Sequence, residues 1–532
     1  MRTKTAMLAL LGTAMLFGCA SHEAYRTNVV NPWLDKTQCP ADRNGNTDAG
    51  CDNRTPELVD GKYELHYVEF DDQGWLHPEP ATASDATAAS PSDAAPGAGV
   101  DHSAQQIDAL MDDLKQHLRA KTDLKVIVFV HGWKHSAQSD DDNVMKFRRL
   151  LERAASDELY QSAKRQVIGI YVGWRGKPWL VPDPGLDLSF WSRKDAASRV
   201  STGSVRELFA RLRSMQRYFN LQALGEHRRP AMRTLMIGHS FGGLILYAAT
   251  SGPLIESLTA QSDLAGLPPL HSGGNESKDR AAEAQAERVA DLIVLVNPAF
   301  EASRFEALYR VANRQQHKCY VPPVLVSITS ETDLATGMAF PAGRFLNTLF
   351  ERPASSSDQA TAIKRTPGNM DRYVTHVLHG PASEATGAGA QNALPAANAV
   401  CEGWKPGSAL LTLTNQDLEQ AVKDNKTREV KQSQDFIAGL NASATFPATW
   451  KRTFCGGATL EVNQQEGENN AQTLVWNIRA EPSIINGHGD VMNPALLDVV
   501  RQMFGDTDLP GNQTDQPDQP RQPPPPQECE KG

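Results

Sequence analysis

Several features that mark common protein classes are missing from this sequence of 532 residues. Beyond residue 19, no apolar run approaches the roughly 20 residues that a membrane-spanning helix needs. No C-x-x-C pair and no cysteine–histidine cluster has the spacing of metal ligands. The formal net charge is −10, and no basic stripe is present. These absences predict a body without transmembrane helices, without a bound metal and without a nucleic-acid partner.

Cysteine is scarce, with seven in the whole chain. One of them, Cys19, ends an apolar amino-terminal segment, and the other six permit three disulfide bonds in an exported protein. Cys39 and Cys51 are the favoured pair because they are close in sequence and flanked by turn-forming residues. The pairing of the rest stays open. The six are Cys39, Cys51, Cys319, Cys401, Cys455 and Cys529.

The amino terminus has the layout of an export signal. Residues 1–5 carry the positive charge, residues 6–17 are apolar, and Leu-Phe-Gly-Cys ends at Cys19. This layout resembles a bacterial lipoprotein signal. The resemblance implies that Cys19 becomes the lipidated first residue, and that Ala20 after it directs the protein to the outer membrane, facing the periplasm or the cell surface. The alternative is a plain secretory peptide in which the cysteine is incidental.

Composition divides the rest of the chain. Residues 81–99 consist of small and polar residues, and the end of the chain is rich in proline and glutamine, so neither stretch has enough bulky apolar side chains to pack. The expected organisation begins with a signal peptide at 1–18 and a tether at 19–105 that contains one strand at 63–70. A large domain follows at 106–504, with an insertion around 335–470, and residues 505–532 form a disordered tail.

The motif Gly-His-Ser-Phe-Gly-Gly at 238–243 is the most informative stretch. It follows the apolar run 234–237 and precedes the apolar run 244–249. A G-x-S-x-G turn between a strand and a helix needs small residues on both sides of the serine, because the strand and the helix approach closely there. The pattern predicts that Ser240 is a nucleophile on such a turn.

A second strand-like run precedes another glycine turn. Residues 126–130 read Val-Ile-Val-Phe-Val and end in His131-Gly132-Trp133. In serine hydrolases of this layout, one oxyanion donor comes from this loop and the other from the residue after the nucleophile. The predicted donors are therefore the backbone N–H groups of Trp133 and Phe241, and His131 is expected to be structural.

An acidic residue follows the strand-like run 323–328. Asp333 lies just beyond the carboxyl end of that run, where the active sites of open α/β sheets gather. A carboxylate at this place can orient a histidine. Glu331 is the close competitor, since the two acids share parity along the chain. Glu301, after the run 292–300, is a weaker candidate.

The best-placed histidine is His488. It lies on a glycine-containing loop, after the strand-like run 473–478 and before the helix-like run 494–504, as a general base in this chemistry requires. His376 and His379 are the alternatives. Both sit in the apolar, strand-like stretch 373–380, where histidine is more often structural or exposed than catalytic.

The order Ser240, Asp333, His488 is the order of triad residues in α/β-hydrolases. The chain resembles that superfamily from about residue 106 to 504, and its esterase and lipase branch through Val-Phe-Val-His-Gly-Trp at 128–133 and Asn-Gly-His-Gly-Asp at 486–490. The resemblance implies a mostly parallel central sheet flanked by helices, acyl transfer through an acyl-enzyme, a small-molecule or lipid-like ester as substrate, and no cofactor.

Two alternatives remain open at the level of sequence. One is a non-catalytic surface-binding protein that keeps the hydrolase scaffold, because fold alone does not establish activity. The other is a peptidase or thioesterase on the same triad. We also expect residues 177–200, with part of 335–470, to form a cap that excludes water from the active site.

Overall fold

The computed structural model describes residues 24–26, 56–59, 62–77, 105–159, 164–177, 189–263, 288–314, 320–348, 357–381, 415–443, 445–464 and 470–507. The predicted signal segment with Cys19 lies outside the described residues, as does the Pro/Gln-rich tail from residue 508. Cys455 is engaged in a disulfide bond. The expected pair Cys39 and Cys51 lies outside the described residues. Within the described ranges, no helix is long and apolar enough to cross a membrane.

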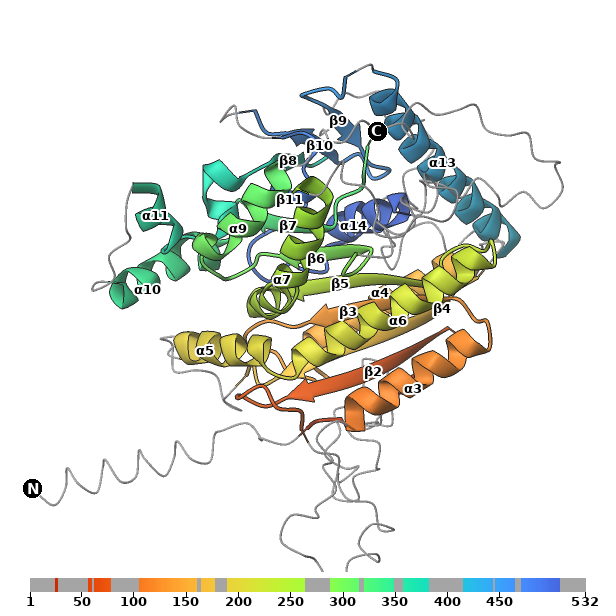
Figure 1. Ribbon diagram of the computed structural model, residues 1–532, viewed down its shortest axis with the longest axis horizontal. Coiled ribbons are helices and arrows are strands. Elements are labelled where there is room, and N and C mark those ends of the chain that lie inside the picture. Colours follow the sequence, from red (N-terminus) through yellow and green to blue (C-terminus); the bar gives the residue numbers. More distant parts are fainter. Residues whose placement is uncertain are drawn as a thin grey trace, which may run out of the picture.

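A single mixed sheet of 11 strands runs through the centre of the protein (Figure 1). Its order is β1-β2-β4-β3-β5-β6-β7-β11-β8-β10-β9. Every pairing from β2 to β8 in this order is parallel, and the pairings at the two edges are antiparallel. The strands are β1 (Glu57–Val59), β2 (Tyr63–Phe70), β3 (Leu124–Val130), β4 (Gln166–Trp174), β5 (Met232–His239), β6 (Leu292–Val296), β7 (Leu325–Ser330), β8 (His376–His379), β9 (Lys451–Thr453), β10 (Thr459–Val462) and β11 (Val475–Ala480).

Helices cover both faces of the sheet, and each face has its own apolar core. The core on one face includes side chains of α3 (Gln105–Arg119), α5 (Ser189–Thr202), α6 (Val205–Gly225), α7 (Phe241–Asp263) and α9 (Ala302–Asn313). The other core includes side chains of α4 (Asp142–Leu159), α13 (Asn415–Asn441) and α14 (Pro494–Asp506). Short helices α10 (Phe340–Asn347) and α11 (Ser357–Ala362) follow β7.

The strands are apolar along their whole length because both of their faces are covered. In β3, Val126, Val128 and Val130 enter one core, whereas Ile127 and Phe129 enter the other. This alternation follows from the two-residue period of a strand, and continuous apolar runs are typical of parallel sheets buried on both sides. The predicted mostly parallel sheet flanked by helices is confirmed.

Part of the expected insertion belongs to the sheet. The strand predicted around 373–380 is β8, which pairs in parallel with β11, and β10 and β9 continue the sheet beyond it. This part of the chain extends the central sheet, and the cap expected from residues 177–200 and another part of 335–470 stays a prediction. Phe190 and Trp191, within the stretch 177–200 that is expected to contribute to a cap, lie at the start of the helix α5.

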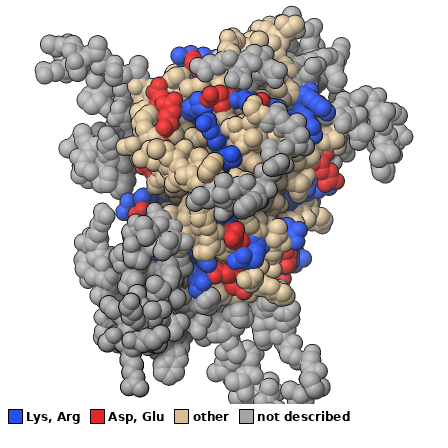
Figure 2. Space-filling view, turned by 90° about the vertical axis from the view of Figure 1, so that its left-hand side faces the viewer, with Lys and Arg blue, Asp and Glu red and all other residues tan. Residues whose placement is uncertain are grey.

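Surface charge is mixed. Figure 2 shows one face of the molecule on which acidic and basic side chains lie next to one another. Exposed ion pairs of this kind, such as Arg211 with Asp108 at 2.6 Å, contribute only about 0–1 kcal/mol each because water and salt screen them. The two buried cores therefore dominate the stability of the fold.

Candidate active site

Ser240 lies on a tight turn between β5 and α7. The strand ends at His239 and the helix begins at Phe241, so Ser240 alone connects them. Its φ is +55°, which is a left-handed backbone conformation that residues other than glycine rarely adopt. Neighbouring backbone groups hold this strained turn: the Ser240 N–H donates to the Val296 carbonyl at 3.0 Å, and its carbonyl accepts from the Ala299 N–H at 3.2 Å.

Two glycines let the turn pack against the end of β3. A Cβ on Gly242 would overlap the carbonyl oxygen of Val130 and would lie 2.5 Å from that of His131. A Cβ on Gly132 would lie 2.9 Å from the Cβ of Ser240. The turn after β3 therefore lies directly against the serine, which is the approach that the two sequence motifs predict.

The structure brings Ser240, His488 and Asp333 into one chain of hydrogen bonds. The Oγ of Ser240 lies 2.8 Å from Nε2 of His488, and Nδ1 of His488 lies 2.8 Å from Oδ2 of Asp333. An ionised carboxylate can only accept, so the proton is on Nδ1, and Nε2 is left to accept from the serine hydroxyl. The three residues follow β5, β11 and β7, all at the carboxyl edge of the sheet.

Asp333 is buried and well supplied with donors. Its Oδ2 accepts from Thr336 Oγ1 at 2.6 Å, and its Oδ1 accepts from the backbone N–H of Ala335 at 2.9 Å. Burial by itself raises the pKa of this carboxyl, but the hydrogen bonds from His488 and Thr336 outweigh burial and hold the pKa below its ordinary value. Asp333 is therefore ionised at neutral pH and fixed in orientation.

The loop that carries His488 is anchored through its backbone. His239 donates from Nε2 to the His488 carbonyl at 2.9 Å, and Asn297 donates from Nδ2 to the carbonyls of Gly487 and His488, each at 3.0 Å. Burial lowers the pKa of His239 to about 3, so its ring is neutral and has one N–H to donate. Thr332 Oγ1 accepts from the Gly487 N–H at 3.0 Å. We call this group of contacts the loop anchor.

His239 and Asn297 were not predicted from the sequence. Both lie at the carboxyl ends of strands, His239 at the end of β5 and Asn297 immediately after β6. Asn297 has a φ of +46°, which asparagine tolerates better than most residues, and it precedes a proline. Asn297 could have been found in the sequence as a polar residue that stands between the end of a strand and a proline.

The side chains of Trp133 and Phe241 flank one aromatic ring of α5. The Phe190 ring centroid lies 5.2 Å from that of Trp133 and 4.8 Å from that of Phe241. Trp133 also donates from Nε1 to Ser189 Oγ at 3.0 Å. Helix α5 thereby fixes both residues whose backbone N–H groups were predicted to bind an oxyanion.

His131, next to Trp133, has a structural role. Its ring is buried, and burial lowers its pKa to about 4. Nδ1 donates to the Gly132 carbonyl at 2.9 Å, and Nε2 accepts from the Trp174 N–H at 3.0 Å. These bonds set the path of the glycine turn beside Ser240.

The competing acids and histidines lie elsewhere. Glu331 is exposed, and Glu301 is paired with Lys194 at 2.6 Å and with Arg304 at 3.0 Å. His376 is buried against Trp450 and Trp476, and His379 lies between Glu461 and Glu481. Among the described residues, none of these four candidates bonds to the triad.

Known proteins give no further information about this site. No family model, no curated protein and no solved structure matches the chain. The function of the site is therefore inferred from the geometry and chemistry of its residues.

Gly242→Ala is expected to destabilise the protein by several kcal/mol, because the new methyl group overlaps the end of β3. Gly439→Ala, within the helix α13, is the control, since nothing lies within 4 Å of its Cβ, and it should be neutral or stabilise by about 0.5–1 kcal/mol. Thermal unfolding of the two variants measures the difference. Equal melting temperatures would contradict the close packing of the turn.

Asp333→Asn is expected to flatten the acid side of the stability profile. Because the pKa of Asp333 is lowered in the folded state, its ionisation stabilises the fold above the unfolded value of 3.8. That contribution is lost as the pH falls through the folded pKa. Unfolding midpoints between about pH 5 and pH 2.5 should fall less steeply in the variant than in the wild type. Asp358→Asn, which changes an exposed carboxylate, should keep the wild-type slope.

Proposed function

We propose that this protein is a serine hydrolase of the α/β-hydrolase type that cleaves carboxylic esters. One observation carries the proposal: a serine on a strained turn between a strand and a helix lies 2.8 Å from a histidine that is bonded to a buried carboxylate. A serine hydroxyl is a weak nucleophile until an adjacent base takes its proton. The Asp333–His488 pair is such a base.

The first half of the reaction acylates the enzyme. The Oγ of Ser240 forms a bond to the carbonyl carbon of the ester, and its proton passes to Nε2 of His488. Asp333 stabilises the imidazolium and keeps it aligned. When the tetrahedral intermediate collapses, the bond to the alkoxide breaks, and His488 returns the proton to the leaving alcohol.

The second half releases the acid. Water attacks the acyl-enzyme and gives a proton to Nε2 of His488, and the bond between the carbonyl carbon and Oγ then breaks with return of that proton to Ser240. Each half passes through a negatively charged oxygen. We assign its stabilisation to the backbone N–H groups of Trp133 and Phe241: Phe241 follows Ser240 directly, and Trp133 follows Gly132, whose turn packs against Ser240. Loss of one such donor costs about 10²–10³-fold in rate.

Several features of the site favour turnover over simple binding. Maintaining Ser240 in a left-handed conformation costs about 1–3 kcal/mol, which a binding scaffold has no reason to retain. The loop anchor fixes the carbonyl of His488 by two side chains, and α5 fixes both oxyanion residues. Esters are favoured over amides because an unspecialised site of this kind expels an alkoxide more readily than an amine.

We further propose that the hydrolase is attached to the outer membrane of a bacterial cell through lipid on Cys19. The support is the order of a basic segment, a short apolar segment and Leu-Phe-Gly-Cys in the sequence. The substrate would then meet the enzyme at the membrane, either in the periplasm or at the cell surface.

A fluorophosphonate probe should label the full chain at Ser240, and Ser240→Ala should abolish labelling. His488→Ala should slow labelling and the hydrolysis of a p-nitrophenyl ester by at least about 10³-fold, because the hydroxyl loses its base. Gel fluorescence and product absorbance measure the two effects.

His379→Gln is the matched control for this experiment, since His379 is also a partly buried histidine that is bonded to a carboxylate, and it should label at the wild-type rate. A wild-type chain that stays unlabelled would point to the binding-protein alternative. A panel of esters, thioesters and anilides would identify a thioesterase or peptidase by its preferred substrate.

Cys19→Ser is expected to abolish incorporation of an alkyne-labelled fatty acid in cells and to move the protein from the membrane pellet to the soluble fraction, because the thiol is the acylation site. Cys455→Ser serves as the control and should retain the label, since Cys455 is engaged in a disulfide. A labelled Cys19→Ser protein would contradict the anchor.

A further inference from the structure

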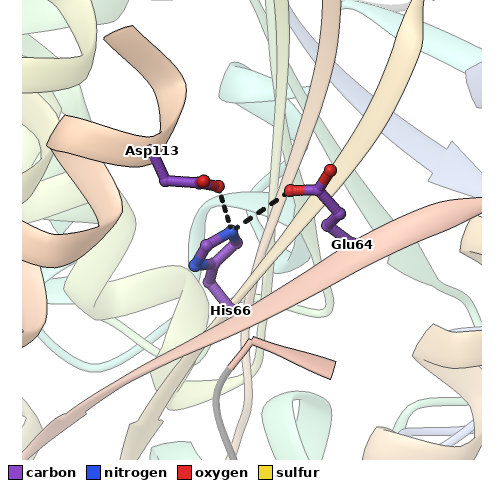
Figure 3. A group of neighbouring side chains, drawn as sticks. All are labelled: Glu64, His66 and Asp113. Atoms are coloured by element: carbon purple, nitrogen blue, oxygen red, sulfur yellow. Dashed lines mark ion pairs between the residues drawn. The ribbon is translucent and has the colours of Figure 1, made fainter. Parts of the chain in front are cut away.

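A second cluster of titratable side chains lies on β2 and α3, which carry no triad residue. Glu64 and His66 are two positions apart on a strand and therefore share the face that α3 covers. Asp113 and His117 are four positions apart on α3 and therefore share one side of the helix. Figure 3 shows Glu64, His66 and Asp113 pointing toward one another across the gap between strand and helix.

Glu64, His66 and Asp113 each offer a ligand atom within 4.8 Å of the other two, which suits one small cation, and His117 lies beside Glu64 as a further donor. Nε2 of His66 lies 3.1 Å from Oδ2 of Asp113 and 3.9 Å from Oε2 of Glu64. Nε2 of His117 lies 3.0 Å from Oε1 of Glu64 and 4.0 Å from Oδ2 of Asp113. Tetrahedral ligands on bonds of about 2.0–2.2 Å are separated by about 3.3–3.6 Å, which falls within this range.

The buried histidine of the cluster is not satisfied by hydrogen bonds. The side chain of His66 is 6% exposed, and its Nε2 faces the two carboxylates without making a hydrogen bond of acceptable geometry. Oδ2 of Asp113 is buried and unsatisfied as well. These two atoms form an ion pair with each other at 3.1 Å. Their hydrogen-bond geometry is poor, and a metal ion held between them would ligate both atoms.

We propose that Glu64, His66 and Asp113 bind one divalent transition-metal ion of the zinc type, and that the partly exposed His117 turns toward the ion as the fourth ligand. Two neutral imidazoles and two carboxylates carry a charge of −2, which a divalent ion balances. Four protein ligands fill a tetrahedral coordination shell, so the ion has a structural role and no catalytic one. The metal-free alternative is a network of ion pairs between imidazolium and carboxylate groups.

The proposed ion joins two elements that are distant in sequence. Strand β2 lies near one edge of the sheet, and α3 follows only after the connection 71–104. The apolar stripe of α3, including Leu110 and Leu114, packs on the same face of the sheet. The ion would hold the polar side of α3 against β2, and the apolar stripe holds the other side of α3 against the sheet. The expectation of no metal rested on cysteine patterns, and this ligand set contains none.

Zinc binding by the full, untagged chain with its free thiols alkylated tests the proposal. Equilibrium dialysis with Zn²⁺ should give one tightly bound ion per chain, and zinc should raise the thermal midpoint by about 2–4 °C. X-ray absorption of the bound zinc should show nitrogen and oxygen ligands at about 2.0–2.1 Å with imidazole signals and without sulfur. Failure to bind zinc, or sulfur in the coordination shell, would overturn the proposal.

Asp113→Asn and His117→Gln alter the two partly exposed ligands, so at least one variant should keep the fold, as judged by circular dichroism. Loss of a residue that only bonds to a metal ligand lowers the metal affinity by about 10–100-fold. Each variant should lower the zinc affinity by more than this and should remove the zinc-dependent rise of the thermal midpoint. His379→Gln, in a cluster where both ring nitrogens already have partners, should bind zinc like the wild type. Unchanged binding in a folded Asp113→Asn or His117→Gln variant would refute the assignment.

Discussion

The parallel pairing of β7 with β11 is the constraint on which the candidate site depends. In this register Ser330 lies opposite Ala480, so both strands end at the same level of the sheet. The loops that follow are 155 positions apart in sequence where they carry Asp333 and His488, yet their side chains are 2.8 Å apart. The pairing of β5 with β6, and of β6 with β7, brings Ser240 to the same edge. No local interaction could assemble these residues.

Features with a local cause were predictable from the sequence. The turn at Ser240 needs small neighbours within a few positions, and β3 is recognisable because a strand buried on both faces is apolar throughout. The helix α14 and the strand β11 on either side of His488 follow from their own patterns. The mostly parallel sheet flanked by helices could therefore be predicted from the sequence, together with the positions of the motifs at the ends of its strands.

Features that depend on distant partners were not predictable. Glu331 and Asp333 follow the same strand with the same parity, and the turn that buries one and exposes the other is set by a bond from the Asp333 N–H to the Ser330 carbonyl at 3.2 Å. Asn297 becomes important only because the loop after β11 lies beside it. The pairing of β8 with β11 and the meeting of β2 with α3 likewise join parts of the chain that no short pattern links. Helix α5 was missed because its apolar stripe is short and rich in alanine.

The neutral state of His239 has a consequence for how the protein tolerates acid. Its ring takes up a proton only near pH 3, because the buried site disfavours charge. The contact that it makes with the loop backbone therefore stays the same when the surroundings become moderately acidic. Protonation of His239 therefore cannot release the loop that carries His488 until the pH falls to about 3.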